Sequence, residues 1–502
     1  MNALKRRFAG APEGTAALFF IQIFSTLGFA VLYSTLVLYA TKHLQLSVKA
    51  ATMLMGVFGA FNYGLHLFGG YLGGRFLSNR SLFVGSMGLQ VVGCACIASG
   101  TLPLFYVGLA LFLTGSGLNV TCINMMLTQR FAPEDPRREG AFLWNYAGMN
   151  IGFFVGFTVA GYFQGTESYS SLFIFATLGN FVAIVLATLM WKTLADRNTP
   201  LLEVTPKQFR MRQLAGLAIL IGLVPVVWFM LQRPGSTGII LKAICGAVAA
   251  TLIYLTLRHP DRRERRNMTA FLILALGSLM FWSLYQMAPS GLMLFAVNNV
   301  DLIVGPVQIQ PQWIQNINTV CIVIGGPLLA SLFIRMRARG WKIDIPKQFA
   351  ASLLLMAVAF LILPLGIKLA GDGKSAFAWL FASYVLQSIG ELLIMPIGYA
   401  MIGKLAPKQY QGVMMGSWML VTGLASLFAG DFSGMIPEPA GTTAASTNPQ
   451  YAMLFAKLGL GSLVVGIALG VLNPFLRKLI TDKAEPAPIE AATPAGPAPA
   501  VV

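Results

Sequence analysis

Charged residues are scarce in this 502-residue sequence. Asp, Glu, Lys and Arg make up 11% of the chain, hydrophobic residues make up 56%, and the mean hydropathy is +0.71. Ordinary water-soluble domains do not have this composition, because they cannot bury so much apolar surface. The alternating segments of about ten residues that are typical of membrane β-barrels are also missing. The sequence therefore predicts an all-α polytopic membrane protein.

Residues typical of catalytic and metal sites are few as well. The three histidines have no ligand spacing such as H-x-x-x-H, and the five cysteines, Cys94, Cys96, Cys122, Cys245 and Cys321, all fall inside apolar runs. Thiols in such runs usually pack as small hydrophobes. No P-loop, nucleophile triad or dinucleotide fingerprint occurs. We therefore expect no metal, no cofactor and no enzyme activity.

Long apolar runs are abundant instead. A helix needs about 20 residues to cross a hydrocarbon core of roughly 30 Å. Fourteen runs fit, near residues 16–40, 51–73, 81–100, 103–128, 140–164, 170–191, 214–232, 238–257, 268–297, 312–334, 349–370, 376–403, 411–430 and 451–475. The sequence thus predicts fourteen transmembrane helices in contact with membrane lipids.

The basic residues indicate the orientation of these helices. A net charge of +17 could point to nucleic acid, but the Lys and Arg residues stand between alternate spans rather than on one soluble surface. This distribution is typical of cytoplasmic loops. We expect both termini in the cytoplasm and no nucleic-acid partner. The first apolar run is long and lacks a cleavage pattern, so we expect it to be retained.

The spans fall into groups of six, two and six. The expected units are an N-terminal six-helix bundle at 1–191, a cytoplasmic linker with a two-helix insertion at 192–267, and a C-terminal six-helix bundle at 268–483. Two six-helix halves around a site in the middle of the membrane are typical of secondary transporters. The Ala- and Pro-rich tail, 484–502, has nothing large to bury and is expected to be disordered.

Glu391 is the one charged residue in a run bounded by Lys374 and Lys404. An acid in the middle of the membrane costs about 2.5 to 3.5 kcal/mol unless it faces a partner or a wet cavity. A substrate or proton site would explain it. A protonated or hydrogen-bonded Glu joining two helices is the alternative.

Other polar residues are expected at similar depth on several helices, and together they could line a cavity. They are Gln22, Ser25, Thr26, Tyr63, His66, Asn119, Asn124, Asn145, Tyr146, Asn150 and Asn318. Interhelical hydrogen bonding is the alternative for any one of them, and His66 is more often a packed histidine than a proton relay. No Asp or Glu occurs between Glu13 and Glu134, so the N-terminal half would offer a neutral wall.

Several segments together carry a resemblance to a known family. "SYVLQSIGELLIMPIGYAMIGKLAP" resembles helix ten of the proton-dependent oligopeptide transporters (POT/PTR). "LWNYAGMNIGFFVG", "WIQNINTVCIVIGGPLLA", "GVMMGSWML" and "LMLFAVNNVD" resemble helices five, eight, eleven and the end of helix seven. The resemblance implies the major facilitator fold with a two-helix insertion and a peptide transporter of the inner membrane.

The resemblance also implies roles for particular residues. Glu391 and Asn318 would hold the amino group of a peptide, with Asn150 and Tyr146 nearby, and Glu391 would be a candidate for proton coupling. Tyr63 would contribute to the pocket, and Trp282 and Trp418 would form aromatic walls. A lone carboxylate with amide neighbours suits an ammonium group, because ion pairs strengthen where water is scarce.

The sequence departs from the family at its charged positions. The helix-one E-x-x-E-R pattern falls on Gln22, Ser25 and Thr26. The helix-one Arg, the helix-four Lys and the helix-seven Asp-Arg pair fall on Tyr33, Val120, Val297 and Asn298. The seat for a peptide carboxylate and most of the proton relay are therefore missing, although Tyr33 stays among the expected pocket residues.

The prediction is a secondary transporter of di- or tripeptides, or of peptide-like amines without a required carboxylate, whose proton coupling is reduced or altered. An uncoupled facilitator or an exporter of a modified peptide is the alternative. A receptor built on a transporter fold ranks lower, because the short loops offer no signalling module.

Overall fold

The computed structural model describes residues 12–132, 135, 137–166, 168–341, 344–435 and 443–480. The predicted tail, 484–502, and the first basic residues lie outside the described residues. In the described part there are fourteen helices of 20 residues or more, and each overlaps one of the fourteen predicted spans. Their caps agree with the sequence: the Ser78 and Asp344 side chains accept hydrogen bonds from the first-turn amides of the helices that follow.

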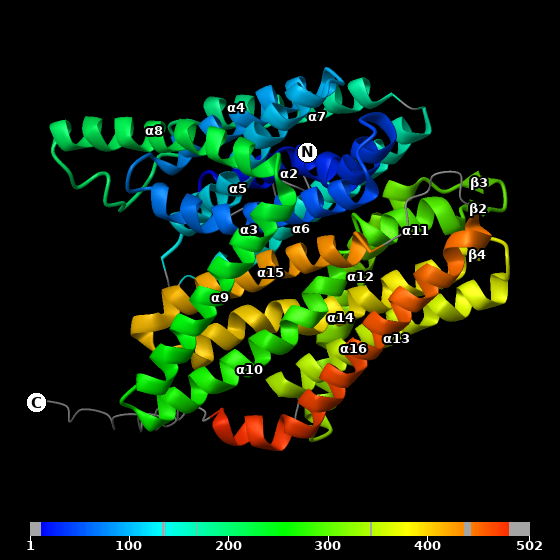
Figure 1. Cartoon of the computed structure of the whole chain (residues 1–502). Coiled ribbons are helices and arrows are strands. Elements are labelled where there is room, and N and C mark those ends of the chain that lie inside the picture. Colours follow the sequence, from blue (N-terminus) through cyan, green and yellow to red (C-terminus); the bar gives the residue numbers. More distant parts are fainter. Residues whose placement is uncertain are drawn as a thin grey trace, which may run out of the picture.

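Six long helices form the N-terminal half, which is the upper body in Figure 1. They are α2 (Thr15–Leu38), α3 (Val48–Leu72), α4 (Asn79–Ala98), α5 (Leu102–Thr128), α6 (Arg137–Gly165) and α7 (Tyr169–Leu189), with a π-helical turn, η1 (Tyr39–His43), after α2. α4 packs on α5 and α7, while α2 packs on α6 and α7. The core between them is mostly apolar, with Phe83, Phe112 and Phe173 among its largest fully buried side chains.

The C-terminal half is the lower body in Figure 1. Its helices are α10 (Arg262–Tyr285), α11 (Gly291–Asn299), α12 (Gln315–Ala338), α13 (Ile345–Ala370), α14 (Phe377–Leu405), α15 (Gln411–Ser433) and α16 (Ala444–Leu479). Short elements connect them: β1 (Val300–Asp301) parallel to β4 (Ser375–Ala376), the β2 (Ile303–Val304) and β3 (Val307–Gln308) hairpin, η2 (Pro311–Ile314) and η3 (Lys408–Tyr410).

One predicted span is not a continuous helix. The run 268–297 was expected to be a single helix, but α10 ends at Tyr285 and α11 begins at Gly291 after a turn. Pro289 lies in this turn and lacks the amide hydrogen that a continuous helix would use. The break places Gln286 at the end of α10, where its side chain is free to face the other half.

The insertion consists of α8 (Pro206–Leu231) and α9 (Pro234–Arg258). α8 packs on α5, whereas α9 packs on α3 of one half and on α15 and α10 of the other. Lys242 of α9 forms an ion pair with Asp431 of α15 and lies over the ring of Phe428. The insertion is therefore attached to both halves.

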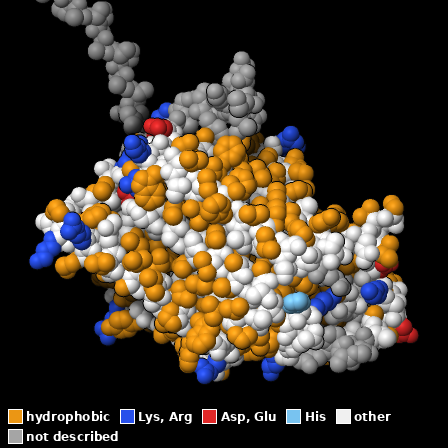
Figure 2. All heavy atoms as spheres, turned by 90° about the horizontal axis from the view of Figure 1, so that it is seen from above, with side chains coloured by type: hydrophobic (Ala, Val, Ile, Leu, Met, Phe, Trp, Pro, Cys, Tyr) orange, Lys and Arg blue, Asp and Glu red, His pale blue; other side chains and the backbone are white. Residues whose placement is uncertain are grey.

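Twelve of the described helices are long and apolar enough to cross a membrane. The other two, α3 and α6, are of similar length but carry polar residues such as Asn62, His66, Asn145 and Asn150 on buried faces. Figure 2 shows a broad apolar surface with Lys and Arg gathered at its edges. This distribution fits a chain surrounded by lipid.

The connections α3–α4, α5–α6, α7–α8, α9–α10, α12–α13 and α14–α15 lie at one end of the helices, which we call the basic face; the other end is the opposite face. Basic side chains join neighbouring connections here: Arg130 donates to the Ala195 carbonyl (3.1 Å), and Arg80 lies over the ring of Trp191. The Asp196 carboxylate accepts from the Asn79 backbone amide at 2.9 Å. These contacts tie the α7–α8 linker to the N-terminal half.

Candidate substrate cavity between the two halves

A cavity of about 700 Å³ lies between the halves. Its lining comes from α2, α3, α5 and α6 on one side and from α10, α12, α14 and α15 on the other. The volume lies within the range of small-molecule sites, roughly 300 to 1,000 Å³. The cavity can hold a ligand of the size of a short peptide.

All eight predicted site residues line this cavity: Tyr33, Tyr63, Tyr146, Asn150, Trp282, Asn318, Glu391 and Trp418. The other polar residues singled out from the sequence, Gln22, Ser25, Thr26, His66, Asn119, Asn124 and Asn145, line it too. Their convergence is a finding, whereas their roles in binding stay predictions.

Glu391 lies near the middle of α14 and is 6% exposed. Asn318 of α12 donates from Nδ2 to Glu391 Oε2 at 2.7 Å and to Ser388 Oγ at 3.1 Å. The Tyr285 hydroxyl interacts with the same carboxylate. Ser388, Gln387 and Tyr384 precede Glu391 by three, four and seven residues, so they share its helix face and line the same cavity. The carboxylate thus faces the cavity among neutral hydrogen-bonding groups.

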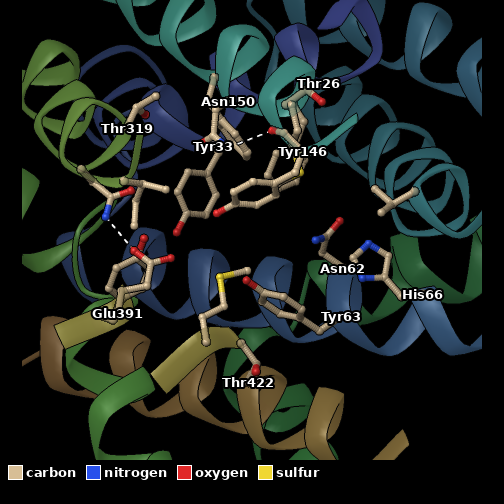
Figure 3. Close-up of a pocket in the computed structure, with 18 of the residues that line it drawn as sticks. Thr26, Tyr33, Asn62, Tyr63, His66, Tyr146, Asn150, Thr319, Glu391 and Thr422 are labelled. Carbon is tan, nitrogen blue, oxygen red and sulfur yellow. Dashed lines mark hydrogen bonds between the residues drawn. The ribbon is translucent and has the colours of Figure 1, made fainter. Parts of the chain in front are cut away.

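Three tyrosines approach this carboxylate from the N-terminal half. Figure 3 shows the hydroxyls of Tyr33 and Tyr146 pointing toward the side of the cavity that holds Glu391, with Tyr63 below them. Asn150 donates from Nδ2 to the Tyr146 carbonyl at 2.9 Å. Phenol groups offer both donors and acceptors, so this wall can bind polar groups of a ligand without adding charge.

The two tryptophans form part of the C-terminal wall. Trp282 and Trp418 are 6% and 3% exposed. A Cβ at Gly398 would overlap the Trp418 ring, so this glycine of α14 allows the indole to lie against the helix. The Trp282 Nε1 atom is buried and has no hydrogen-bond partner among the described residues.

Sequence reasoning missed Gln286, which joins the halves beside the cavity. Tyr33 donates to Gln286 Oε1 (2.9 Å), and Gln286 Nε2 donates to the Tyr63 hydroxyl (3.0 Å). Nearer the opposite face, Gln312 donates to Gln164 Oε1 (3.0 Å) and Trp313 to the Thr158 carbonyl (2.9 Å). The halves are therefore closed together on this side.

From this closed side, the cavity extends toward the basic face. Its lining includes Phe142 and Leu143 in the first turns of α6, and Asn124 in the last turns of α5. Residues 158–164 of α6, which contact η2 and α12, are not part of it. The described side chains thus form a cavity closed at the opposite face.

Comparison with known proteins assigns this architecture to a family. A family model described as the POT family (PTR2) matches residues 80–449. The chain belongs to the POT family. It is therefore a multi-pass membrane transporter of this family and not an enzyme, as predicted.

The curated relatives of this POT-family chain are permeases. It is 28% identical over 489 residues to dipeptide and tripeptide permease A of Salmonella typhimurium strain LT2, with 96% of this chain and 95% of that protein covered. It is also 28% identical to dipeptide and tripeptide permease A of Escherichia coli strain K12, over 491 residues, with 96% of this chain and 95% of that protein covered.

Solved structures share the fold. A crystal structure of peptide transporter POT in complex with sulfate has a TM-score of 0.83 at 24% identity and covers 94% of this chain and 96% of that one. A POT family transporter in complex with 5-aminolevulinic acid has a TM-score of 0.81 at 20% identity and covers 93% and 98%. At these identities the likeness supports the fold alone.

Proposed function

We propose that this protein carries di- or tripeptides, or peptide-like amines, across the bacterial inner membrane by alternating access between its two halves. The observation that carries the proposal is the charge of the cavity. Among its described lining residues, Glu391 alone bears a formal charge at neutral pH, and no Lys or Arg lies among them. The names of the permease relatives also support a peptide-like substrate.

Glu391 and Asn318 hold the amino group of the substrate. A carboxylate buried among neutral groups attracts an ammonium ion strongly, because little water screens the pair. Asn318 donates to Glu391 Oε2 and Tyr285 bonds the same carboxylate, so its orientation is fixed. A carboxylate has about four lone-pair sites, so its oxygens can still accept from the substrate. Tyr146, Asn150 and Tyr63 line the space around this end.

A free carboxylate on the substrate is not required. Tyr33 and Val120 line the cavity at the positions where, by the resemblance, the family carries Arg and Lys. Neither side chain can neutralise an anion. Burying an unpaired carboxylate is costly. Substrates with a neutral second end therefore bind better than zwitterions.

Proton coupling is reduced. At the position of the family's E-x-x-E-R pattern, Gln22 donates to Thr26 Oγ1 at 2.8 Å and accepts from Asn145 Nδ2 at 3.2 Å. This network is neutral, although the Asn145 Oδ1 atom has no hydrogen-bond partner among the described residues. The basic face is cytoplasmic, with both chain termini there, since loops rich in Lys and Arg stay inside.

Counterflow in proteoliposomes tests the proposal, with wild type, Glu391→Gln and Asp301→Asn, which removes an exposed carboxylate outside the cavity. Loss of a charge-assisted hydrogen bond costs about 1.5–3 kcal/mol, or roughly 10- to 150-fold in affinity. We expect that loss in Glu391→Gln and not in Asp301→Asn, and no binding of N-acetylated peptides. Equal competition by N-acetylated and free peptides contradicts the proposal.

A second measurement addresses coupling. Flux is compared with and without an imposed pH gradient. We expect counterflow without strong gradient-driven accumulation. Accumulation that depends on the gradient and disappears in Glu391→Gln would contradict reduced coupling while keeping Glu391 in the site.

A further inference from the structure

The cavity has a second polar end, in the N-terminal half, away from Glu391. Figure 3 places Asn62, His66 and Thr26 on the opposite side of the cavity from Glu391 and Thr319. Asn62 and His66 are four residues apart on α3 and therefore share a helix face. Both line the cavity, and Asn62 is 8% exposed. We call Asn62 and His66 the neutral end of the cavity.

The Ser116 hydroxyl of α5 lies beside the amide of Asn62. Its Oγ is 3.3 Å from Asn62 Oδ1 and 3.3 Å from the Leu113 carbonyl oxygen, so its single hydrogen is shared between these two acceptors. The bond to Asn62 occupies the carbonyl oxygen of the side chain, and Figure 3 shows the Asn62 nitrogen directed toward the centre of the cavity. An amide nitrogen is a donor only, so the group presented to a ligand calls for an acceptor such as a carbonyl oxygen.

His66 completes this end without adding a fixed charge. Its Nε2 atom is buried and has no hydrogen-bond partner among the described residues. The ring meets that of Tyr63 edge-on, with centroids 6.0 Å apart. A doubly protonated imidazole needs an acceptor at both nitrogens, and the sealed Nε2 lacks one, which favours the neutral ring.

The spacing between the two ends suits a short peptide. Counting about 1.5 Å per residue from the basic-face ends of α3 and α14, Asn62 lies roughly 15 Å and Glu391 roughly 21 Å along the helices, a difference in depth of about 6 Å. The two residues also lie on opposite sides of the cavity, which adds a lateral separation (Figure 3). An extended tripeptide spans about 10 Å. A ligand with its amine at Glu391 would bring its last carbonyl group close to Asn62.

We propose that Asn62, positioned by Ser116 and flanked by His66, donates a hydrogen bond to the terminal carbonyl oxygen of an uncharged substrate end, such as a carboxamide or ester. This inference rests on the proposed function, because it takes Glu391 as the seat of the amine. It defines the substrate class as elongated monocations with a neutral carbonyl terminus.

Two ligands that differ only in the terminal carboxamide test it. They are trialanine amide and dialanine isopropylamide, in which a methyl group replaces that carboxamide. Equilibrium affinities are measured on the purified full-length protein in nanodiscs. A neutral hydrogen bond corresponds to about three- to tenfold in affinity. We expect wild type to prefer trialanine amide by that factor, and Asn62→Leu to bind both ligands alike with isopropylamide affinity near that of wild type.

Ser116 supplies the positioning control. In Ser116→Ala the Asn62 amide loses its anchor, so the preference for trialanine amide falls, and Ser116→Thr, which keeps a hydroxyl, restores it. A merely structural role would lower the affinity of both ligands together. That result, or equal affinity of wild type for the two ligands, overturns the inference.

The Glu391→Gln variant separates this inference from the proposed function. One outcome is that Glu391→Gln lowers the affinity for both ligands while wild type binds the two equally. In that case the role of Asn62 is refuted and Glu391 remains the binding site of the amine. If Glu391→Gln leaves both affinities unchanged, the proposed function fails, and with it the inference.

Discussion

The hydrogen bonds of Gln286 stabilise the arrangement in which the two halves are closed at the opposite face. Its side chain accepts from Tyr33 and donates to Tyr63, and it is 5% exposed. Replacing it with Leu keeps the volume and removes both bonds. At about 0.5–1.5 kcal/mol net for each bond, the closed arrangement loses roughly 1–3 kcal/mol, which is about 5- to 150-fold in the equilibrium with an arrangement open at this face.

Spin labels can measure this shift. Two exposed positions at the opposite face are replaced by cysteine for labelling: Ser171 in the first turn of α7 and Val307 in the β2–β3 hairpin. In a background without the five native cysteines, these labels report the distance between the halves. We expect Gln286→Leu to raise the fraction of long distances by at least about fivefold. Tyr33→Phe removes one bond and should give a smaller increase. A distance distribution in Gln286→Leu indistinguishable from the parent would refute the reasoning.

Three further predictions concern other contacts. Gly398→Ala displaces the Trp418 ring, so we expect binding to weaken by about tenfold, measured by equilibrium titration. Burial raises the pKa of Asp196, so its ionised form is disfavoured in the fold and stability falls as the pH rises above about 4; Asp196→Asn should lessen this fall in thermal unfolding between pH 4 and 8. Removing Lys242 alone leaves Asp431 unpaired, so Lys242→Ala should lower the unfolding temperature more than the double variant with Asp431→Ala does.

Each of these has a distinguishing control. Gly412→Ala meets no atom within 4 Å of its new Cβ and should leave binding unchanged. Equal loss in Gly398→Ala and Gly412→Ala would contradict the role of the Trp418 contact. A pH profile of Asp196→Asn that parallels that of wild type would contradict the effect of burial on Asp196. An additive double variant at Lys242 and Asp431 would show that their ion pair contributes nothing.

Much of the cavity could be predicted because polar groups are costly in lipid. Glu391 stood out as a lone charge in a long apolar run, and Asn318, Tyr146 and Asn150 are polar residues in similar runs. Since such side chains seldom face lipid, their helices were expected to turn them inward. All of them line the cavity.

Contacts between distant segments could not be predicted in the same way. Gln286 follows an aromatic run, and its link to Tyr33 and Tyr63 depends on the break after α10, which the continuous apolarity of 268–297 concealed. Asn62, next to Tyr63 in the sequence, was not predicted as a site residue, because its role depends on the Ser116 hydroxyl of another helix. Hydropathy reports depth in the membrane and not which helices become neighbours.

The attachment of α9 limits how the two halves can move. Because α9 packs on α3, α15 and α10 at once, and α3 packs on α15, these helices form a continuous seam between the halves. A rocking motion that exchanged the open and closed ends of the cavity would pivot along this seam, where displacements are smallest. The loop at 232–233, at the tip of the hairpin, therefore offers a place for a fusion partner or antibody epitope that reports on tilt without entering the transport path.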